Sequence, residues 1–482
     1  MSTTIKLGPV TRVEGHLDIE VTVGSVGGKQ QVLSAKSAGT MFRGFEMILK
    51  GRDPRDAAFY TQRICGVCPI SHGMAASLAL EAAFGIQAPD NGRIVRNLVL
   101  GANYIQSHIL HFYHLAALDY IDTTGIIDMA PWTPRYVTTD MASGSPAKDL
   151  VNHYVLALAM RRKAHQMGAI LGGRMPCSPV FVGGGETQPV TTGAIADFRA
   201  LLSELRNFID TVFIPDVQTV GQIFPEYYAV GKGCGNLLAY GVFDLDAAGT
   251  RKLLARGRLT GGQLTTVNTG QIKEYVKYSW YTATSGNRNP AAGVTTPQAT
   301  KVGAYSWLKA PRYLNQPHEV GALARMWVNG DYRRGISALD RIVARTLETK
   351  KVADAMDNWL NELAVGGPVF KGARIPATAT GIGLTEAPRG ALGHWLQISA
   401  GKVGSYQIVT PTAWNASPKD DRGIMGPIEQ ALVGTPVKDV NQPVEVLRVV
   451  HSFDPCLSCA VHLAKPSGDG QKFVVHVEPA AV

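Results

Sequence analysis

Apolar and polar residues alternate in a short stretch near the start of the chain. Residues 17–23 place every second side chain on an apolar face, and residues 31–35 can form a second strand that returns beside them. Such alternation is typical of a strand with one buried face. Gly27-Gly28 lies between the two stretches as a turn signal, so the pattern predicts an antiparallel hairpin.

Downstream of Asp53 the apolar residues recur every three or four positions, which is the period of a helix. The predicted helical segments are residues 72–84, 91–121, 147–171, 194–213 and a helix-rich block at 335–363. Gly172-Gly173 ends the third segment and Pro215 ends the fourth. Residues 216–310 are rich in glycine, threonine and aromatic residues, which indicates short strands and loops. We therefore expect an α+β fold, predominantly α-helical, with a buried helical bundle and small peripheral β-sheets.

Three histidines recur at helical spacing within residues 91–121. His108, His111 and His114 have the residue type of a metal site. Asparagine, glutamine and serine are interleaved with them, however, and no carboxylate cluster is adjacent in the sequence. We interpret these three side chains as structural.

Length and charge limit the class of protein. A chain of 482 residues exceeds the usual size of a single core, so length alone would suggest several domains. A hydrophobic content of 45% and a charged content of 18% are typical of a globular protein with a large core. The net charge is +9, yet lysine and arginine are scattered, without a basic block or a nucleic-acid motif. We expect no nucleic-acid partner and interpret the charge as a solvated surface that favours an acidic protein partner.

Membrane and targeting signals are missing from the sequence. Residues 1–6 lack the apolar segment of a signal peptide. No stretch reaches the run of about 18 apolar residues that a membrane-spanning helix needs. We therefore expect no transmembrane segment, and the sequence leaves the compartment open between the cytoplasm and an exported or membrane-associated site.

The candidate chemistry lies in two C-x-x-C pairs at opposite ends of the chain. Cys65 and Cys68 are followed by His72, and Cys456 and Cys459 are followed by His462. Thiolates are soft ligands, and four of them are enough to enclose a soft transition metal. A site built from both ends requires the fold itself to close it, which favours one continuous body. The first pair also precedes a predicted helix, whose dipole helps to keep thiols ionised.

Three other interpretations of these cysteines are weaker. A structural zinc site uses the same ligands, but its pairs usually lie roughly 12–20 residues apart; zinc stays an alternative. A thioredoxin-like redox pair needs a single C-x-x-C near a βαβ pattern, and neither pair has that setting. Six cysteines in 482 residues do not form a disulfide scaffold.

Several long motifs, in order, resemble the large subunit of nickel-iron hydrogenases. The resemblance spans nearly the whole chain. It rests on Gly8-Pro9-Val10-Thr11-Arg12-Val13-Glu14-Gly15-His16, Phe42-Arg43-Gly44-Phe45-Glu46, Arg63-Ile64-Cys65-Gly66-Val67-Cys68, Lys309-Ala310-Pro311-Arg312-Tyr313, Glu386-Ala387-Pro388-Arg389-Gly390-Ala391-Leu392, and Asp454-Pro455-Cys456-Leu457-Ser458-Cys459-Ala460-Val461-His462. It implies a hydrogenase that splits dihydrogen.

The resemblance implies a nickel-iron centre on the four cysteines. Cys68 and Cys459 would bridge nickel to an iron that carries carbonyl and cyanide ligands, while Cys65 and Cys456 would bind nickel alone. The positions that match the pocket of these diatomic ligands are Arg389, Pro411 and Thr412.

Further roles follow from the same resemblance. Glu14 matches the proton relay, although without the family it would be interpreted as an ordinary exposed glutamate at a strand edge. A magnesium site would be formed by Glu46, the carbonyl of Ile408 and His462. His72 would donate to a ligand sulfur. Asp454, which we expect to be extended because Pro455 follows it, would lie over the open metal position.

The chain departs from the family pattern at two positions. Ser107 stands where many members carry an aspartate, and Cys177 stands where histidine is common. Neither departure removes a metal ligand.

Electron flow implies a partner. Only Cys177 and Cys234 remain outside the motifs, too few for a four-cysteine cluster. We therefore expect an iron–sulfur small subunit, which would also carry any export signal. A hydrogen sensor coupled to a signalling protein is the alternative; Val67 and Leu115 match the open gas route of the catalysts.

The resemblance also divides the chain. Residues 1–462 would form a single body, and residues 463–482 a C-terminal extension that a maturation protease removes after His462 once nickel is in place.

Overall fold

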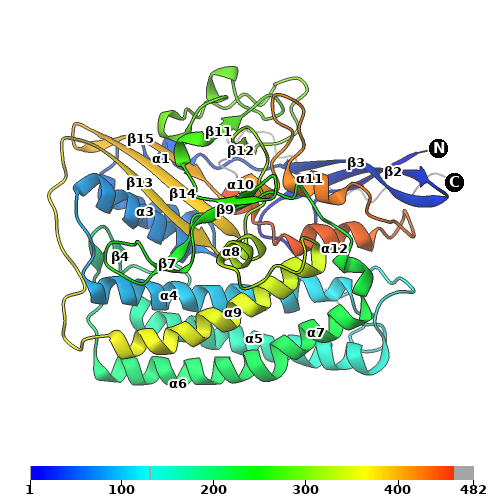
Figure 1. The fold of residues 1–482 in the computed structure, drawn as a ribbon, viewed down its shortest axis with the longest axis horizontal. Helices are drawn as coiled ribbons and strands as arrows, with labels where there is room; N and C mark the ends of the chain where they lie inside the picture. Colours follow the sequence, from blue (N-terminus) through cyan, green and yellow to red (C-terminus); the bar gives the residue numbers. More distant parts are fainter. Residues whose placement is uncertain (1, 130–131, 134, 461–482) are drawn as a thin grey trace.

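A computed structural model describes residues 2–129, 132–133 and 135–460. Residues 459 and 460 are described by their backbone alone. Its largest apolar core lies in a layer of long helices (Figure 1). This layer contains α4 (Asp90–Ile109), α5 (Gly144–Gly172), α6 (Thr192–Phe208), α7 (Ile214–Ile223) and α9 (Ala338–Glu362). Gly101 lets α4 approach α9 closely, because a Cβ there would lie 2.7 Å from the sulfur of Met356. Four of the five predicted helical segments, residues 91–121, 147–171, 194–213 and 335–363, therefore correspond to helices of this layer, whereas the sequence does not predict α7 as a separate helix.

Two helix ends differ from the prediction. The helix expected over residues 91–121 is α-helical only to Ile109 and continues as the π-helix η3 (Leu110–Ala116) and the 3₁₀ turn η4 (Ala117–Asp119). Pro215 does not stop the helix before it, because the π-helix η5 (Ile209–Phe213) leads directly into α7. Pro215 occupies the first turn of α7, where a missing N–H is tolerated.

The predicted N-terminal hairpin is confirmed. β2 (Leu17–Val26) pairs antiparallel with β3 (Lys29–Gly39), and β1 (Thr3–Leu7) adds to the other edge of β2. Val26 faces Lys29 across the turn, so Gly27 and Gly28 are its two central residues. Both have positive φ values, 58° and 81°. A tight turn with left-handed geometry at both positions suits glycine and matches the twist of the strands.

A second antiparallel sheet, of three strands, is not peripheral, which corrects that part of the sequence prediction. It contains β13 (Thr378–Ala387), β14 (Gly390–Ser399) and β15 (Lys402–Val409), and β14 is buried along most of its length. Helix α3 (Pro69–Phe84) packs across it (Figure 1). Gly381 and Gly383 let the backbone of β13 approach the backbone of α3 directly. A Cβ on either residue would lie 1.9 Å from a carbonyl oxygen of α3. The sequence could not show the buried position of this sheet by alternation of apolar and polar residues. Alternation marks a strand with one face in solvent, whereas this sheet packs against helix α3.

The remaining elements are short. They are the helices α1 (Phe45–Leu49), α2 (Ala57–Thr61), α8 (Ala322–Asn329), α10 (Pro411–Asn415), α11 (Pro427–Leu432), α12 (Val444–Ser452) and α13 (Leu457–Ala460), and the strands β4 (Phe181–Val182), β5 (Gly185–Glu186), β6 (Leu237–Ala239), β7 (Val242–Asp244), β8 (Lys252–Leu254), β9 (Gly257–Thr260), β10 (Gln263–Thr265), β11 (Ile272–Tyr275) and β12 (Ala310–Tyr313). Apart from α7, residues 216–310 form the short strands, turns and loops that the sequence predicts. Among the described residues, no helix is long and apolar enough to cross a bilayer.

The contact between α3 and β13 can be tested at Gly383. In Gly383→Ala the new methyl group would meet the carbonyl oxygen of Ala75 at 1.9 Å, so helix and strand must separate. We expect the free energy of unfolding to fall by about 1–3 kcal/mol, the usual cost of overpacking. Gly193→Ala is the control, because a Cβ there has no neighbour within 4 Å. Chemical denaturation of both variants measures the difference, and equal stabilities would contradict this account of the packing.

Candidate metal centre

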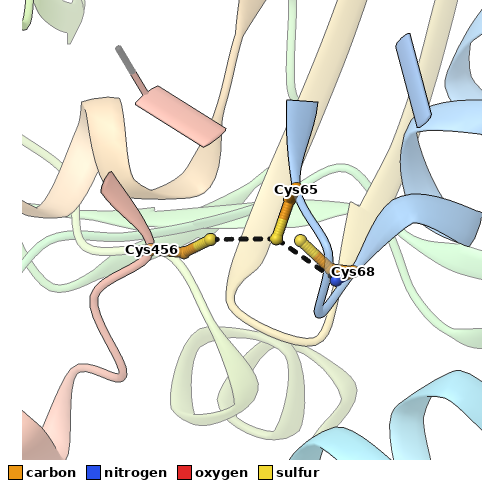
Figure 2. Close-up of side chains that lie close together, drawn as sticks. All are labelled: Cys65, Cys68 and Cys456. Atoms are coloured by element: carbon orange, nitrogen blue, oxygen red, sulfur yellow. Dashed lines mark hydrogen bonds between the residues drawn. The ribbon is translucent and has the colours of Figure 1, made fainter. Parts of the chain in front are cut away.

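Three of the four motif cysteines meet in the interior of the molecule. The ligand atoms of Cys65, Cys68 and Cys456 all lie within 4.8 Å of one another, and all three residues are buried. The sulfurs of Cys65 and Cys456 are 3.2 Å apart (Figure 2). The fold therefore closes the two ends of the chain on one thiol cluster, as the sequence predicts. The side chain of Cys459 lies outside the described residues.

Local structure explains the positions of the first pair. Cys65 is extended and directly follows the 3₁₀ turn Gln62–Ile64, so that the backbone N–H groups of Val67 and Cys68 donate to its sulfur at 3.2 and 3.3 Å. Cys68 is the N-cap of α3, with Pro69 as the first helical residue. The expected placement at a helix N-terminus is confirmed, and it favours a negatively charged sulfur.

The first cysteine of the second pair lies between the last two helices, and Cys459 falls within α13. Cys456 separates α12 from α13, and its backbone N–H donates to the hydroxyl of Thr412 at 2.9 Å. Glu14 forms a parallel β-bridge with Cys456, and the N–H of Leu457 donates to the Glu14 carbonyl at 2.6 Å. Gly15 is needed beside this bridge, because its φ is +85° and a Cβ would lie 2.5 Å from the nitrogen of Ser458.

Glu14 is a half-buried residue of this bridge, which overturns the interpretation that its sequence context alone favours. Burial raises the pKa of its carboxyl, and the negative charge of Cys65 raises it further. The preceding residues are held by Arg12, which pairs with buried Asp119 and donates to the carbonyl of Leu115 at 2.6 Å. His451 holds the same segment, since its Nε2 lies 2.9 Å from the carbonyl oxygen of Thr11.

Arg389 and Asp454 form a buried ion pair beside the thiols. Arg389 Nη2 lies 2.9 Å from Asp454 Oδ1. Burial alone would raise the pKa of Asp454, but the positive charges of Arg389 and its neighbours outweigh burial and lower it. Burial alone would lower the pKa of Arg389. The negative charges around it outweigh burial and raise the pKa well above its usual value; they belong to Asp454, Cys456, Cys68 and Cys65.

The ion pair leaves hydrogen-bonding capacity unused. Among the residues that the structure describes, Arg389 Nε and Asp454 Oδ2 have no hydrogen-bond partner, and Arg389 Nη2 and Asp454 Oδ1 meet only each other in the ion pair. The Nη1 atom of Arg389 lies 3.4 Å from the hydroxyl of Ser107. Buried polar atoms are rarely left unmatched without a reason, and here they lie near enough to Cys65, Cys68 and Cys456 for the charges of these residues to act on Arg389. This fits a bound polar group and therefore the predicted centre.

Asp454 is not extended, which corrects the expectation drawn from Pro455. Its φ is +54°, and its N–H donates to the carbonyl of His451 at 2.9 Å. Aspartate is one of the few residues other than glycine that adopt this left-handed conformation readily. The turn that ends α12 therefore prevails over the local preference of a residue before proline.

The residues expected around magnesium are brought together where the structure describes them. The backbone N–H of Ile408 donates to Glu46 Oε1 at 2.9 Å, and the other carboxylate oxygen accepts from the Thr295 hydroxyl. Lys309 lies next to this group, 3.1 Å from the Thr295 oxygen. His462 lies outside the described residues. Pro411 and Thr412 begin α10, next to Cys456.

Two buried groups near His72 escaped the sequence analysis. His72 Nδ1 lies 3.2 Å from His394 Nε2, and His394 Nδ1 lies 2.8 Å from the Tyr406 hydroxyl. His394 and Tyr406 stand on β14 and β15, far from any cysteine motif in the sequence. No spacing could have pointed to them, because only the pairing of the strands with α3 brings them close.

The structural interpretation of the three helix histidines is supported by their partners. His108 Nε2 lies 2.9 Å from Glu348, His111 Nε2 lies 2.7 Å from the carbonyl oxygen of His451, and His114 Nε2 lies 3.2 Å from that of Tyr154. Among the described side chains, the group that could hold a metal is the cysteine cluster.

Comparison with known proteins identifies the family. The family model described as nickel-dependent hydrogenase matches residues 43–133, 125–335 and 329–462. This chain belongs to the nickel-dependent hydrogenase family. Membership confirms the predicted enzyme class, an oxidoreductase that acts on dihydrogen, and it favours nickel over the zinc alternative.

Relatives match over almost their whole length. The chain is 42% identical to the periplasmic [NiFeSe] hydrogenase large subunit of Desulfomicrobium baculatum, over 98% of this chain and 97% of that protein. It is 32% identical to the hydrogenase-2 large chain of Escherichia coli K12, over 97% and 99%. The reduced Ni-Fe-Se hydrogenase structure from D. vulgaris Hildenborough has a TM-score of 0.92 and 43% identity, over 96% of this chain and all of that one.

The thiol cluster makes metal content the direct test of this site. Cys456→Ser should lower nickel per chain at least tenfold, since serine offers a poor ligand to a soft metal. Cys234→Ser is the matched control: its sulfur lies 3.5 Å from the Asn236 carbonyl oxygen and is not part of the cluster. Elemental analysis of both purified variants checks this. Full nickel occupancy in Cys456→Ser would contradict the site, and one zinc without nickel in the parent protein would overturn its metal.

Proposed function

We propose that this chain is the subunit that activates dihydrogen in a nickel-iron hydrogenase, with Cys65, Cys68, Cys456 and Cys459 as the ligands of the centre. The main support for this proposal is the buried cluster of three thiols from opposite ends of the chain. It lies beside an ion pair with unmatched polar atoms. The relatives from D. baculatum and E. coli, named as hydrogenase large subunits, support it. The relatives' names favour a catalyst over the hydrogen sensor, which is the alternative.

The bound centre would supply the redox chemistry that accepts the electrons of dihydrogen. The protein would supply the ligands and the surroundings: four thiolates hold the metals, and Arg389 presents fixed N–H donors in a dry pocket. Burying such donors without a partner costs free energy. When a polar ligand accepts their hydrogen bonds, they stabilise its negative charge. Carbonyl and cyanide ligands on iron would face Arg389, Pro411 and Thr412.

Glu14 would take the proton away from the centre. It lies at the Cys456 segment, and its pKa is raised, so it holds a proton at a higher pH than an exposed glutamate does. A magnesium ion would be held by Glu46, the Ile408 carbonyl and His462, because carboxylate and carbonyl oxygens suit that hard cation. His72 would orient a ligand sulfur from its place beside His394.

Electrons would leave through an iron–sulfur small subunit. Outside the four motif positions the chain has Cys177 and Cys234, which cannot form a four-cysteine cluster. The large-subunit names of the relatives support such a partner. The relative from D. baculatum is named as periplasmic, which is consistent with an export address on the small subunit.

Residues 1–462 would form the mature body, and residues 463–482 would be removed by a maturation protease. A physical reason supports removal. Cys459 must stay accessible while metals are inserted, and His462 can turn inward as a new C-terminus only without the tail.

Glu14→Gln tests the proton route. The amide keeps the shape of the side chain but cannot carry a proton, so turnover and hydrogen–deuterium exchange should both fall about 100-fold or more, the typical contribution of a positioned acid–base group. Nickel and iron contents should stay unchanged. Glu20→Gln is the control, because Glu20 pairs with Lys36 on the surface hairpin. Unchanged activity in Glu14→Gln would refute the relay.

Intact mass tests the tail. We expect the active holoenzyme to end at His462 and the metal-free precursor to extend to Val482. Mass spectrometry of both forms decides this, and full-length mass in fully active enzyme would show that the tail is permanent.

A further inference from the structure

Arg389 stands in a hairpin turn that the strands themselves do not favour. Ala387 faces Gly390 across the turn between β13 and β14, so Pro388 and Arg389 are its two central residues. The ring of proline fixes a negative φ, and Arg389 is not among the residues with positive φ. Two-residue hairpins favour turns with positive φ at the first central residue, because those turns match the twist of the strands. Gly390, directly after the turn, has a φ of 135°, and contacts from outside the hairpin also hold the turn.

Arg325 supplies these contacts from α8, and its side chain is fully buried. Its guanidinium group donates five hydrogen bonds, the full number of its N–H groups. Two go to the carboxylate of Glu348 at 2.6 and 2.7 Å, and one goes to Glu386 at 2.8 Å. The last two go to the carbonyls of Ala387 at 2.9 Å and Pro388 at 2.8 Å.

The residue at the start of the turn is fixed by two further bonds. The other carboxylate oxygen of Glu386 accepts from the backbone N–H of Tyr240 at 2.6 Å, and its carbonyl accepts from the hydroxyl of Tyr104 at 2.9 Å. Glu348, in turn, lies 2.9 Å from His108 Nε2. The positive charge of Arg325 thus lies between two buried carboxylates that anchor it to α9 and β13.

The two buried arginines have opposite roles. Arg325 has every donor matched, whereas among the described residues Arg389 Nε has no hydrogen-bond partner and Nη2 meets only Asp454 in the ion pair. An arginine with unmatched donors would relax toward nearby carbonyls if its backbone could move. We propose that Arg325 is a positioning residue: it fixes the Pro388–Arg389 turn so that the Arg389 guanidinium stays beside Asp454 and the cysteine cluster with its donors available. The proposal rests on the proposed function.

Arg325→Lys in the complete holoenzyme tests this. Lysine keeps the charge but has three donors and no planar fork, so it can replace at most three of the five hydrogen bonds that hold Glu348, Glu386 and the two carbonyls. We expect nickel and iron to remain, the infrared bands of the iron-bound diatomic ligands to shift, and dihydrogen oxidation to fall about 100-fold, as for a catalytic group displaced by roughly 1 Å.

Arg312→Lys is the matched control. Arg312 is also fully buried with five donated hydrogen bonds, but they go to other partners: Pro311, Ser417, Pro418, Asp420 and Ile424. It should lose stability in the same way and leave the infrared bands in place. Unshifted bands in Arg325→Lys, or equal shifts in both variants, would overturn the positioning role. Parent enzyme without nickel would instead refute the proposed function.

A double-mutant cycle distinguishes the positioning of Arg389 from a purely structural effect of Arg325. If Arg325 acts through Arg389, then Arg325→Lys should cost much less activity in an Arg389→Lys background than in the parent enzyme, whereas independent effects would multiply. Multiplying effects would contradict the proposal. If Arg325→Lys does not fold, Tyr104→Phe replaces it in both measurements. That variant removes only the hydrogen bond to the Glu386 carbonyl. The same shift of the infrared bands and the same non-additivity would support the proposal, and the expected loss of activity is smaller.

Discussion

Soft and acidic ligand groups gathered in a buried interior are the constraint on which this structure depends. Three thiols and the carboxylate of Asp454 lie together, fully buried. Buried charges are costly unless they are paired or bind a metal. Arg389 pairs directly with Asp454, and the N-terminus of α3 adds a partial positive charge at Cys68. The remaining charge fits a cation held by the sulfurs.

Closing this site from both ends of the chain depends on contacts between segments that are distant in the sequence. Cys456 reaches Cys65 only because residues near Glu14 pair with the segment that carries Cys456, and because α3 lies directly on β13. Gly15, Gly381 and Gly383 make these approaches possible where a Cβ would collide with backbone atoms. Length alone would have suggested several domains, whereas the thiol cluster joins residues from near both ends of the described chain.

Buried arginines connect the irregular segments that surround the helical layer. Arg325 binds the turn before β14, Arg96 donates to the carbonyls of Val182 and Gly185, and Arg448 donates to that of Asp119. Carbonyls in turns and loops have no partner within a helix or sheet, so they need donors from elsewhere. Arginine suits this task because its charge persists and its planar group reaches several acceptors at once. The same residue type thus supports the fold at Arg325 and faces the site at Arg389.

The sequence by itself determined what depends on local period and on residue type. The hairpin around Gly27-Gly28, the helix after Cys68, the long helices and the four-cysteine motif all follow from short-range patterns. Only the tertiary structure decided the burial of Glu14, the left-handed Asp454, the central position of β13–β15 and the partners of Arg325. Each of these depends on contacts between segments distant in the chain, and such contacts override local preference because burial and hydrogen bonding there outweigh it.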